Sequence, residues 1–564
     1  MTQQDYPWLK NYPEKPGWKL DIPEKSLMQA LDDTASQKPQ AQAFDYMGKT
    51  YSWADIQKSV NHFAAGLQML GVKKGHKIGL FLPNSPLFMI AYYGILKAGA
   101  TAVNYNPLYA SEELAHQIED SETDIMITLD LSALYPKATK MLEETRLKTL
   151  IVGKFTDMLT FPKNILFPIV KAKDKAKVVF SDNIISLEAV MNNDGALAPI
   201  EIDIHNDIAV LQYTGGTTGI PKGAMLTHHN LYANALQCLV NFPDDQDHYK
   251  MVAVLPFFHV FAMTVTMNLC VVGGIEIVSI PRFDLKQTLE LIDSKKPHFM
   301  AAVPAIFNAM NNYPKISSYD LSSLQFCISG GAALPVEVKK SFEGKTGCVV
   351  VEGYGLTESS PVSNVNPPFG ENVAGSIGLP LPETIIEIID REDKKTPMPL
   401  GERGEVCIRG PQVMKGYWKN QEASEDVLRK TEDGGLRLHT GDIGIMDERG
   451  YTYIVDRIKD MIITNGYNVY PRNIEEKIYE HPAIEECIVA GLPDAQRGEI
   501  VKAWIKLKDG QRLDEAGLRK FLEEKLSKME MPKRIEFRAE PLPKTMIGKL
   551  SRKDIVAQEL EKKA

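Results

Sequence analysis

The segment at residues 213–223, YTGGTTGIPKG, is dense in glycine and threonine. Backbone N–H groups and hydroxyls in such a loop bind phosphate oxygens, and a lysine adds a positive charge. The segment departs from the ordinary nucleotide loop G-x-x-x-x-G-K-[ST], because its lysine lies between a proline and a glycine. It therefore predicts a phosphate site of another kind, with a plain surface loop as the alternative. The residues expected at the phosphates are Thr214, Gly215, Gly216, Thr217, Thr218, Gly219 and Lys222.

A second segment able to do chemistry is EGYGLTESSP at residues 352–361. A tyrosine ring between two glycines can lie flat against a nucleotide base. The threonine and glutamate that follow can reach a phosphate and its magnesium ion, a hard cation that takes oxygen ligands. The segment predicts a base and phosphate site, although a plain turn has a similar composition. Its candidate residues are Glu352, Gly353, Tyr354, Gly355, Thr357 and Glu358.

Two later segments each carry one candidate. HTGDIG at residues 439–444 contains Asp442, whose carboxylate can accept hydrogen bonds from two ribose hydroxyls. PKTMIGKLSRK at residues 543–553 contains Lys549 directly after a glycine. Taken alone, the first segment has the composition of an ordinary turn and the second that of a solvated tail. Their order and spacing after the two earlier segments indicate a nucleotide site assembled from most of the chain.

The composition is that of an ordinary globular protein, with 44% hydrophobic and 24% charged residues among 564. A chain of this length forms two or more domains. The formal net charge of −9 argues against a nucleic-acid partner. The six cysteines include no C-x-x-C pair, and the N-terminus lacks the apolar core of a secretory signal. We therefore expect a cytoplasmic location with reduced thiols.

Short apolar runs that end in glycine or proline alternate with amphipathic stretches through most of the chain. One such run, IAVLQY at residues 208–213, directly precedes the glycine-rich segment. The alternation predicts an α/β fold of layered, mostly parallel sheets, with ligand sites at the carboxyl ends of the strands. After about residue 401, short strands separated by turns predict a small β-rich subdomain. We expect a large N-terminal domain over residues 1–458 and a small mobile α+β domain over residues 459–564.

Residues 251–275 contain no formally charged side chain and are long enough to cross a bilayer. Pro256, His259, Asn268 and paired glycines interrupt this run, and Glu276 follows it. We therefore predict a buried strand, loop and helix here instead of a membrane span. The same run and residues 300–310 are candidates to line a tunnel for an acyl chain, with simple core packing as the alternative.

Together these segments resemble the adenylate-forming superfamily, which includes acyl-CoA synthetases, firefly-type luciferases and the adenylation domains of peptide synthetases. The matching pieces extend over almost the whole chain: YTGGTTGIPKG, LPFFHVFA, SGGAALP, EGYGLTE, LHTGDIG, VDRIKDMIITNGYNVYPRNIEE and PKTMIGK. YTGGTTG…PKGAMLTH and NGYNVYPRNIE are most similar to bacterial long-chain fatty-acid–CoA ligases. The resemblance implies conversion of a fatty acid, ATP and coenzyme A into acyl-CoA, AMP and pyrophosphate, with Mg²⁺ as cofactor.

The resemblance also implies roles for residues in the nucleotide site. The glycine-rich loop would bind the β- and γ-phosphates that leave as pyrophosphate, with Thr214 and Glu358 at the magnesium ion. This explains why the loop lacks the ordinary nucleotide pattern, since the bond that breaks lies at the α-phosphate. The implied contacts to the rest of the nucleotide are Gly331, Ala332 and Tyr354 at the adenine, Thr357 at the α-phosphate, and Asp442 and Arg457 at the ribose.

Further implied roles concern the acyl group, coenzyme A and the motion of the small domain. His259 would stand as a gate beside the acyl carboxylate, with a satisfied core histidine as the alternative. Lys549 would drive adenylation. The small domain would pivot at Lys459 and bring Gly466 and Tyr467, in TNGYNVYP, to the tunnel for the pantetheine arm of coenzyme A. A homodimer is also typical of the family.

Residues 154–173 mix large apolar side chains with four lysines, and two prolines argue against one continuous helix. As a surface patch this segment predicts peripheral contact with the anionic inner face of the cytoplasmic membrane, where fatty acids are delivered. A buried hairpin with solvated lysines is the alternative.

Three other functions stay open at this point. Within the superfamily, the chain can be an acyl-AMP ligase that loads a carrier protein, although too few residues follow Lys549 for a carrier domain. It can also be a ligase for another carboxylic acid, of medium chain length or aromatic. From a different class, it can be a non-catalytic membrane or transport module with a vestigial nucleotide site. That last possibility predicts full function after Lys549→Ala.

Overall fold

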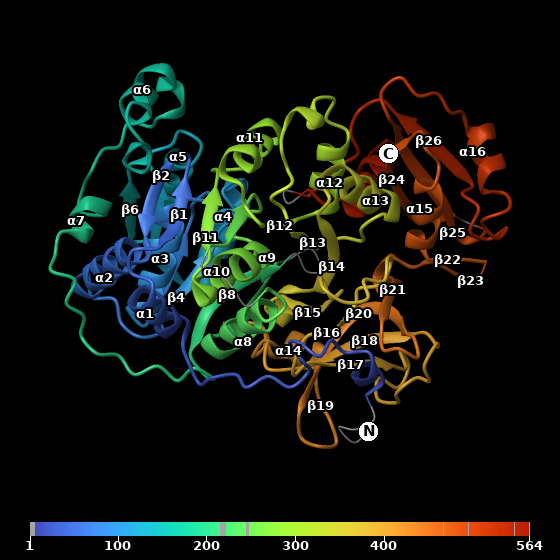
Figure 1. Cartoon of the computed structure of the whole chain (residues 1–564), viewed down its shortest axis with the longest axis horizontal. Coiled ribbons are helices and arrows are strands. Elements are labelled where there is room, and N and C mark those ends of the chain that lie inside the picture. The colour runs from blue at the N-terminus through green and yellow to red at the C-terminus, as the bar shows by residue number, and fades with distance from the viewer. Residues whose placement is uncertain are drawn as a thin grey trace.

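A computed structural model describes residues 6–214, 221–243, 248–465, 467–494, 496–545 and 548–562. Two large sheets, a small antiparallel sheet and a C-terminal sheet with its own core organise these residues (Figure 1). The expected α/β architecture of layered, mostly parallel sheets is confirmed. Six of the sequence candidates lie outside the described residues, namely Gly215, Gly216, Thr217, Thr218, Gly219 and Gly466.

The larger main sheet has nine strands in the order β16-β15-β14-β13-β12-β10-β11-β1-β2. The strands from β14 to β1 run parallel, and β15, β16 and β2 extend the two edges in the antiparallel sense. The parallel strands β11, β12 and β13 are buried along their whole length, as expected where both faces of a sheet are covered. The bounds are β1 (Gln42–Tyr46), β2 (Lys49–Ser52), β10 (Lys250–Ala253), β11 (Glu276–Ser279), β12 (Phe299–Ala302), β13 (Phe326–Ser329), β14 (Val349–Gly355), β15 (Val362–Val365) and β16 (Leu379–Pro380).

The second main sheet has seven strands in the order β7-β6-β5-β3-β4-β8-β9. Six run parallel, and β9 returns antiparallel to β8. The apolar run at residues 208–213, predicted as a strand that directly precedes the glycine-rich segment, lies in β8 and is confirmed. The bounds are β3 (Lys77–Leu80), β4 (Thr101–Asn104), β5 (Thr123–Leu129), β6 (Thr149–Gly153), β7 (Ile184–Ser186), β8 (Ile208–Thr214) and β9 (Lys222–Thr227).

Helix α3 forms the centre of the large core. Ser85 caps its first turn by accepting the backbone N–H of Phe88, and Pro86 occupies the first helical position. Eleven of its twelve residues are buried, which is typical of a helix enclosed on all sides. The helices of the large domain are α1 (Leu27–Gln37), α2 (Trp53–Met69), α3 (Pro86–Lys97), α4 (Ser111–Ser121), α5 (Tyr135–Glu144), α6 (Lys163–Val170), α7 (Leu187–Met191), α8 (His228–Leu239), α9 (Val260–Ala262), α10 (Leu269–Gly273), α11 (Leu285–Lys295), α12 (Pro304–Asn311), α13 (Val336–Thr346) and α14 (Gln421–Val427).

A five-stranded antiparallel sheet forms the β-rich subdomain that the sequence predicts after about residue 401. The N-terminal segment packs on it, because Trp8 and Trp18 are buried in its core. Figure 1 shows the first described residues of the chain, in dark blue, beside this sheet. Its strands are β17 (Ile385–Ile389), β18 (Gly404–Arg409), β19 (Leu428–Lys430), β20 (Leu436–Met446) and β21 (Thr452–Arg457).

The residues after β21 build a separate sheet in the order β23-β22-β25-β24, with β26 added to β25. Two apolar clusters belong to this part of the chain, and Trp504 is fully buried in one of them. The mixture of helices and strands that the sequence predicts for this part of the chain is confirmed. The bounds are β22 (Ile462–Thr464), β23 (Tyr467–Val469), α15 (Pro471–Tyr479), β24 (Ile484–Asp494), β25 (Gly498–Leu507), α16 (Glu515–Leu522), β26 (Arg534–Arg538) and α17 (Arg552–Glu561).

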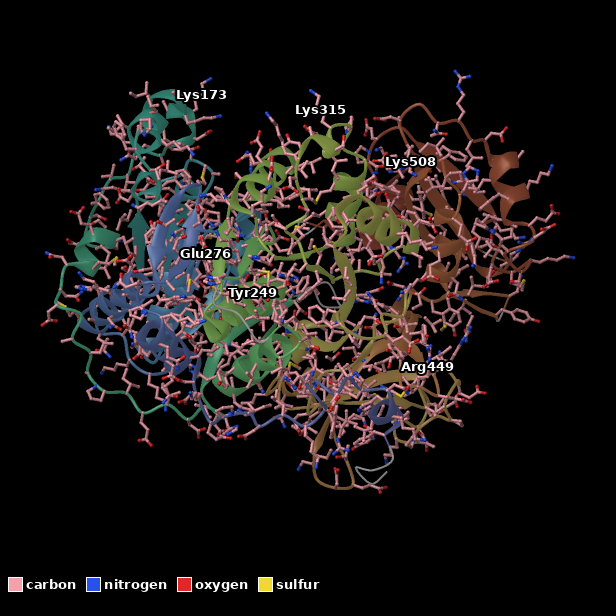
Figure 2. The ribbon with its side chains drawn as sticks, viewed as in Figure 1. Lys173, Tyr249, Glu276, Lys315, Arg449 and Lys508 are labelled. Atoms are coloured by element: carbon pink, nitrogen blue, oxygen red, sulfur yellow. The ribbon has the colours of Figure 1, made fainter. Side chains whose placement is uncertain are left out.

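The uncharged run 251–275 forms β10, a loop, and the continuous helical segment α9, a π-helical stretch (Met263–Asn268) and α10. The prediction of a buried strand, loop and helix is confirmed. Glu276, which follows the run, is buried at the start of β11 and pairs with Lys250 over 3.5 Å (Figure 2). Across the described residues, no helix has both the length and the apolar character that a membrane span requires.

The segment 154–173 forms a 3-10 turn (Phe155–Met158), α6 and a second 3-10 turn (Ala172–Asp174). The prediction that its prolines prevent one long helix is confirmed. The alternative of a buried hairpin is wrong for α6, because no residue of that helix is buried. Figure 1 shows α6 projecting from the body of the large domain.

Candidate active site

The glycine-rich loop joins two antiparallel strands. β8 ends at Thr214 and β9 begins at Lys222, and these residues lie opposite each other in the register of the pair. The ladder therefore fixes both ends of the loop, with a hydroxyl and a lysine at its base. The remaining candidates of this loop fall in 215–219, which the structure does not describe.

Tyr417 connects Lys222 to Glu358, and the sequence interpretation did not identify it. Its hydroxyl donates a hydrogen bond to Oε1 of Glu358 over 2.6 Å. Nζ of Lys222 lies 5.2 Å from the centroid of the same ring, within the range of a cation–π contact. The backbone N–H of Trp418 donates to the carbonyl oxygen of Gly223, which ties the segment to β9. The local sequence KGYW carries no chemical motif of its own, so only the fold reveals this contact.

Glu358 and Thr214 supply donor atoms of the kind that Mg²⁺ prefers. Glu358 is half-buried in the turn after β14, and no ion pair neutralises its carboxylate among the residues that the structure describes. Thr214 offers a hydroxyl at the end of β8. Carboxylate and hydroxyl oxygens are hard ligands that suit this ion. The two side chains therefore fit the magnesium site expected from the sequence.

Three candidates meet where β14, β20 and β21 come together. Asp442 lies opposite Arg457 in the β20–β21 register, and Nε of Arg457 is 3.2 Å from Oδ1 of Asp442. The hydroxyl of Tyr354 donates to Oδ2 of Asp442 over 2.5 Å. Burial and this carboxylate both raise the pKa of Tyr354, so the phenol remains a neutral donor. The buried carboxylate of Asp442 is thus held from both sides, at an orientation set by two strands.

Lys549 extends from the C-terminal part of the chain to the loop after β13. A Cβ atom built on Gly331 would lie 2.8 Å from Cε of Lys549 and 3.4 Å from its Nζ. Gly331 has a φ of +82°, which a residue with a side chain rarely adopts. Burial lowers the pKa of Lys549 to about 8, with Arg457 adding to the shift and Asp442 opposing it. Gly331 therefore leaves the space in which the lysine approaches the Asp442–Arg457 pair.

His259 lies near the same lysine. It precedes α9, and its Nδ1 accepts the backbone N–H of Phe261 over 3.3 Å. Burial lowers the pKa of His259 to about 3, and the charge of Lys549 contributes to that shift. The imidazole is therefore neutral at physiological pH. Ala332 and Thr357 occupy the loops at the carboxyl ends of β13 and β14, next to these groups in the chain.

The segment from Glu352 to Gly355 forms the end of β14. Burial raises the pKa of Glu352 to about 7, although Arg472 of α15 opposes the shift. Gly355 permits a close approach of two chain segments, because a Cβ there would lie 1.9 Å from the carbonyl oxygen of Pro361. The structure thus gives Glu352 and Gly355 roles in burial and close packing on the two sides of Tyr354. Gly353 pairs with Val365 in the adjoining ladder.

Lys459 and Tyr467 stand apart from these groups. Lys459 is exposed in a 3-10 turn (Ile458–Asp460) that follows β21. Tyr467 is 61% exposed on β23, which Figure 1 places at the outer edge of the C-terminal sheet. Arg552 of α17 holds the turn, since its Nη1 lies 3.1 Å from Oδ2 of Asp460. The sequence interpretation missed Arg552, because a lone arginine in a tail has no distinguishing pattern.

A buried pair supports the strand that carries Asp442. Nδ1 of His439 lies 2.7 Å from Oε2 of Glu405 on the neighbouring strand. Oε1 of Glu405 accepts the backbone N–H of Gly441 over 2.9 Å, and Thr440 donates to the carbonyl oxygen of Val406. These bonds fix the irregular turn of β20 around Asp442. The sequence interpretation did not identify Glu405, which lies 34 positions before His439.

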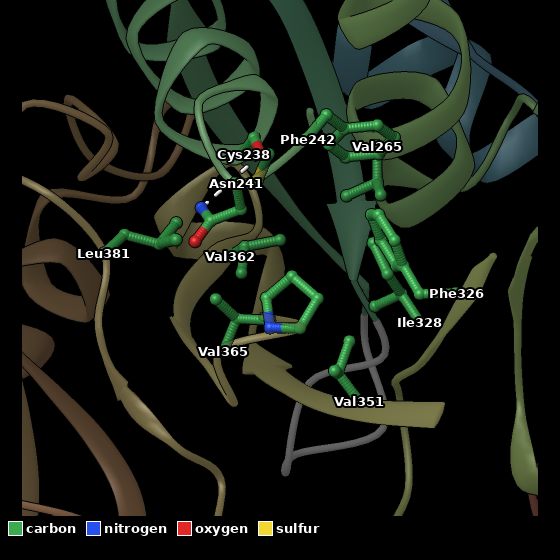
Figure 3. A pocket seen from close by; sticks show the side chains of 11 residues that line it. Cys238, Asn241, Phe242, Val265, Phe326, Ile328, Val351, Val362, Val365 and Leu381 are labelled. Atoms are coloured by element: carbon green, nitrogen blue, oxygen red, sulfur yellow. Dashed lines mark hydrogen bonds between the residues drawn. The ribbon is translucent and has the colours of Figure 1, made fainter. Parts of the chain in front are cut away.

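An apolar cavity of about 20 Å³ is lined in part by side chains of β13, β14 and β15 (Figure 3). Ten of its eleven lining residues carry apolar side chains, and Asn241 turns its amide nitrogen toward the carbonyl oxygen of Gln237. A larger hollow of about 560 Å³ adjoins it and shares three of its lining residues. The cavity is lined by Cys238, Asn241, Phe242, Val265, Phe326, Ile328, Val351, Val362, Val365, Pro368 and Leu381.

These groups define a nucleotide-dependent enzyme of the two-domain α/β type, with charged and hydroxyl side chains gathered at strand ends. The family model described as AMP-binding enzyme matches residues 31–418. The one described as AMP-binding enzyme C-terminal domain matches residues 473–549. The chain belongs to this family of AMP-binding enzymes.

Relatives and solved structures agree with the family assignment. The chain is 44% identical over 564 residues to the long-chain-fatty-acid–CoA ligase of Bacillus subtilis, with 99% of each chain covered. The anthranilate CoA ligase AuaEII in complex with anthranoyl-AMP has a TM-score of 0.84 and 26% identity, covering 97% of this chain and 99% of its own. ATP-bound MatB from Rhodopseudomonas palustris has a TM-score of 0.82 and 28% identity, covering 94% and 98%.

Proposed function

We propose that this chain converts long-chain fatty acids to acyl-CoA through an acyl-adenylate, with release of AMP and pyrophosphate. Membership of the AMP-binding enzymes and 44% identity to a full-length relative named long-chain-fatty-acid–CoA ligase support this function. The observation that carries it is the position of Lys549, which reaches Gly331 next to the Asp442–Arg457 pair. A non-catalytic module would have no use for a lysine held there.

In the first step, a carboxylate oxygen of the fatty acid attacks the α-phosphorus of ATP. A bond from that oxygen to phosphorus forms, and the bond from phosphorus to the bridging oxygen of pyrophosphate breaks. A carboxylate is already ionised near pH 7, so no general base is required. The barrier is dominated by repulsion between anions, and the ammonium group of Lys549 at the phosphoryl oxygens would lower it. Neutral His259 is suited to face the acyl carboxylate.

We assign the nucleotide contacts as follows. Asp442 accepts hydrogen bonds from the ribose hydroxyls, in the orientation that Tyr354 and Arg457 impose. The Tyr354 ring stacks on adenine. The loop that begins at Gly331 and Ala332 bounds the adenine on its other side, and Thr357 contacts the α-phosphate.

The pyrophosphate end of ATP is assigned to the glycine-rich loop and to the residues at the base of that loop. Lys222 places its charge beside the β- and γ-phosphates, and the loop 215–219 would surround them. Thr214 and Glu358 would hold Mg²⁺, with Tyr417 orienting the Glu358 carboxylate. When bound there, the ion supplies positive charge to the phosphate oxygens and to the departing pyrophosphate.

The acyl chain is proposed to occupy the cavity below the site. Its apolar lining suits a hydrocarbon chain, and Val351, which precedes Glu352 in β14, is one of its lining residues. A space of about 20 Å³ holds no more than a water molecule. Entry of a long chain therefore requires Phe242 to move, which joins the cavity to the neighbouring hollow of about 560 Å³. A space of that size is in the range of small-molecule sites.

In the second step, the thiol of coenzyme A attacks the acyl carbonyl and AMP leaves. Lys549 occupies the approach to this carbonyl, so it must withdraw. We propose that residues 459–564 form a mobile domain that pivots at Lys459 and presents the segment around Gly466 and Tyr467 to the pantetheine arm. The exposure of Tyr467 and the turn at residues 458–460 support this motion.

The proposed function is tested by pyrophosphate release from ATP and Mg²⁺ with acids of graded length, with and without coenzyme A. Sustained turnover that depends on coenzyme A, forms AMP and is fastest with long acids is the expected result. A single burst that coenzyme A does not prolong would point to loading of a carrier protein instead. Absence of pyrophosphate with every aliphatic acid would overturn the fatty-acid assignment.

A ligase for an aromatic acid is the second candidate. A solved neighbour of this fold acts, by its name, on anthranilate, although at 26% identity. The same assay with benzoate and anthranilate distinguishes the two, because a site built for a ring would prefer them over palmitate. Cytoplasmic location with peripheral contact to the membrane, and a homodimer, are further predictions that accompany the proposal.

A further inference from the structure

Helix α6 presents apolar side chains to solvent on one face. Ile169 is 71% exposed and Val170 is 72% exposed, and Phe161 just before the helix is 78% exposed. Ile165 and Leu166 lie one helical turn earlier on the same face as Ile169 and Val170. Isolated exposed apolar residues are normal on a protein, but five gathered on one short projection are not.

The opposite face of α6 fixes the helix to the domain. The ring of Phe167 packs against Phe155, with centroids 4.9 Å apart, and Phe155 is buried in the large core. Nζ of Lys163 donates to the carbonyl oxygen of Met47 over 3.2 Å. The exposed apolar face is therefore held in place, and its outward direction follows from the packing of its inner face.

Positive charge surrounds this face. Residues 154–180 contain six lysines and two aspartates, in a chain whose formal net charge is −9. Lys154 and Lys175 pair with Glu188 and Asp130, but three others make no ion pair with any residue that the structure describes. Figure 2 shows one of them, Lys173, at the outer end of the projection. The three are Lys171, Lys173 and Lys177.

We propose that this projection docks the protein on an anionic lipid bilayer. We define the α6 surface as the exposed side chains of Phe161, Ile165, Leu166, Ile169, Val170, Lys171, Lys173 and Lys177. The apolar side chains enter the boundary between headgroups and acyl chains, and the lysines contact the negatively charged headgroups. A convex projection with an apolar tip and basic flanks fits a deformable anionic layer, because it can sink in without a complementary groove.

Docking is independent of the chemistry at Lys549, since no residue of the α6 surface belongs to the candidate active site. If the chain is the ligase proposed above, docking places it where long-chain acids partition. A failure of the ligase assay would leave the docking proposal standing. A failure of docking would likewise leave the ligase assay unaffected.

The test is sedimentation of the full chain with vesicles of phosphatidylglycerol and phosphatidylcholine, compared with vesicles of phosphatidylcholine alone. We expect the protein to bind the anionic vesicles more tightly than the neutral ones, by on the order of tenfold. Binding to the anionic vesicles should fall with added salt. The double variant Ile165→Glu, Ile169→Glu is expected to lose binding to both. The double variant Lys171→Glu, Lys173→Glu is expected to lose the preference for anionic lipid.

Matched variants elsewhere on the surface control for charge and hydrophobicity. Met69→Glu removes a side chain that is 76% exposed at the end of α2, and it should bind vesicles as the unchanged protein does. Lys19→Glu with Lys395→Glu makes the same charge change outside the α6 surface. The melting temperature and far-ultraviolet circular dichroism of each variant, measured without vesicles, show that it is folded independently of any enzymatic activity.

Three results would overturn the proposal. The first is equal binding by the Ile165→Glu, Ile169→Glu variant and the unchanged protein. The second is equal loss of binding in the Met69→Glu control. The third is a dimer in solution that the α6 substitutions dissociate, which would assign this face to a second copy of the chain.

Discussion

The hydroxyl of Tyr417 donates a hydrogen bond to Oε1 of Glu358 over 2.6 Å, across 59 positions of sequence. The same ring lies beneath Nζ of Lys222 at 5.2 Å. One buried aromatic side chain thus sets the position of a carboxylate and a lysine that we assign to the magnesium ion and the phosphates of ATP. Tyr417 is a positioning residue in this arrangement, since it has no assigned contact with the nucleotide.

Tyr417→Phe should weaken the magnesium dependence of the enzyme without unfolding it. The substitution removes the hydrogen bond to Glu358 and keeps the ring below Lys222. Loss of such an outer contact typically costs about 10- to 100-fold in metal affinity. We expect the Mg²⁺ concentration for half-maximal pyrophosphate release to rise by about tenfold, with maximal rate restored at saturating ion. Titration of bound Mn²⁺ by electron paramagnetic resonance measures the same loss without turnover.

The matched control for this variant is Tyr453→Phe, which removes a tyrosine hydroxyl bonded to Asp447 away from the site. It should leave the Mg²⁺ dependence unchanged. An unchanged Mg²⁺ requirement in Tyr417→Phe would show that Glu358 needs no such orientation, or is not a ligand.

Gly331→Ala should impair adenylation more than thioester formation. A Cβ there would lie 2.8 Å from Cε of Lys549, so the lysine must retreat from the α-phosphate. The φ of +82° adds strain of about 1–3 kcal/mol for a residue with a side chain. We expect pyrophosphate release to fall by about tenfold or more, while conversion of synthetic acyl-adenylate to acyl-CoA falls far less. Gly375→Ala is the control, since Gly375 has a φ of +81° with no atom within 4 Å of its Cβ position.

Much of this fold follows from local sequence, and the site follows only in part. Strands such as LQFCISGG are short apolar runs ended by glycine, and the structure has β13 at that place. Asp442 and Lys549 were predicted from the order and spacing of their segments and from the family resemblance, since neither segment is distinctive alone. Tyr417, Glu405 and Arg552 were not, because each acts through a partner far away in the chain. The sequence left the exposure of α6 open between a surface patch and a buried hairpin, since an apolar helix next to lysines is compatible with both.

Adenylation should decline as the pH rises through the pKa of Lys549. Burial, with Arg457 adding to it, lowers that pKa from 10.5 to about 8 in the nucleotide-free enzyme. The ammonium form that stabilises phosphoryl charge is therefore complete well below pH 8 and is lost above it. The value of kcat/KM for ATP reports the free enzyme, so it should fall about tenfold per pH unit above this point. Lys549→Arg should be slower and flat over the same range.

The same pKa shift bears on the motion of the small domain. The pKa of Lys549 is lower when the small domain holds it beside Gly331 than in water. Closure of the small domain without ATP therefore favours the neutral amine. Closure of the small domain in the absence of nucleotide therefore becomes less favourable as the pH falls from 10.5 toward 8. Bound phosphates reverse this effect, because they favour the charged ammonium form of Lys549. A kcat/KM for ATP that stays level from pH 7 to pH 10 would contradict both statements.

Val265→Phe should shorten the range of acids that the enzyme accepts. Val265 lines the apolar cavity of about 20 Å³ from the helical segment after His259, so a larger side chain there fills the cavity from which the acyl chain is proposed to reach the neighbouring hollow. Overpacking costs about 1–3 kcal/mol of stability, which the melting temperature would register separately. We expect kcat/KM for palmitate to fall by about tenfold or more relative to octanoate. Phe242→Ala, which opens the same route, should leave palmitate favoured, and an equal loss for both acids in Val265→Phe would place the acyl chain elsewhere.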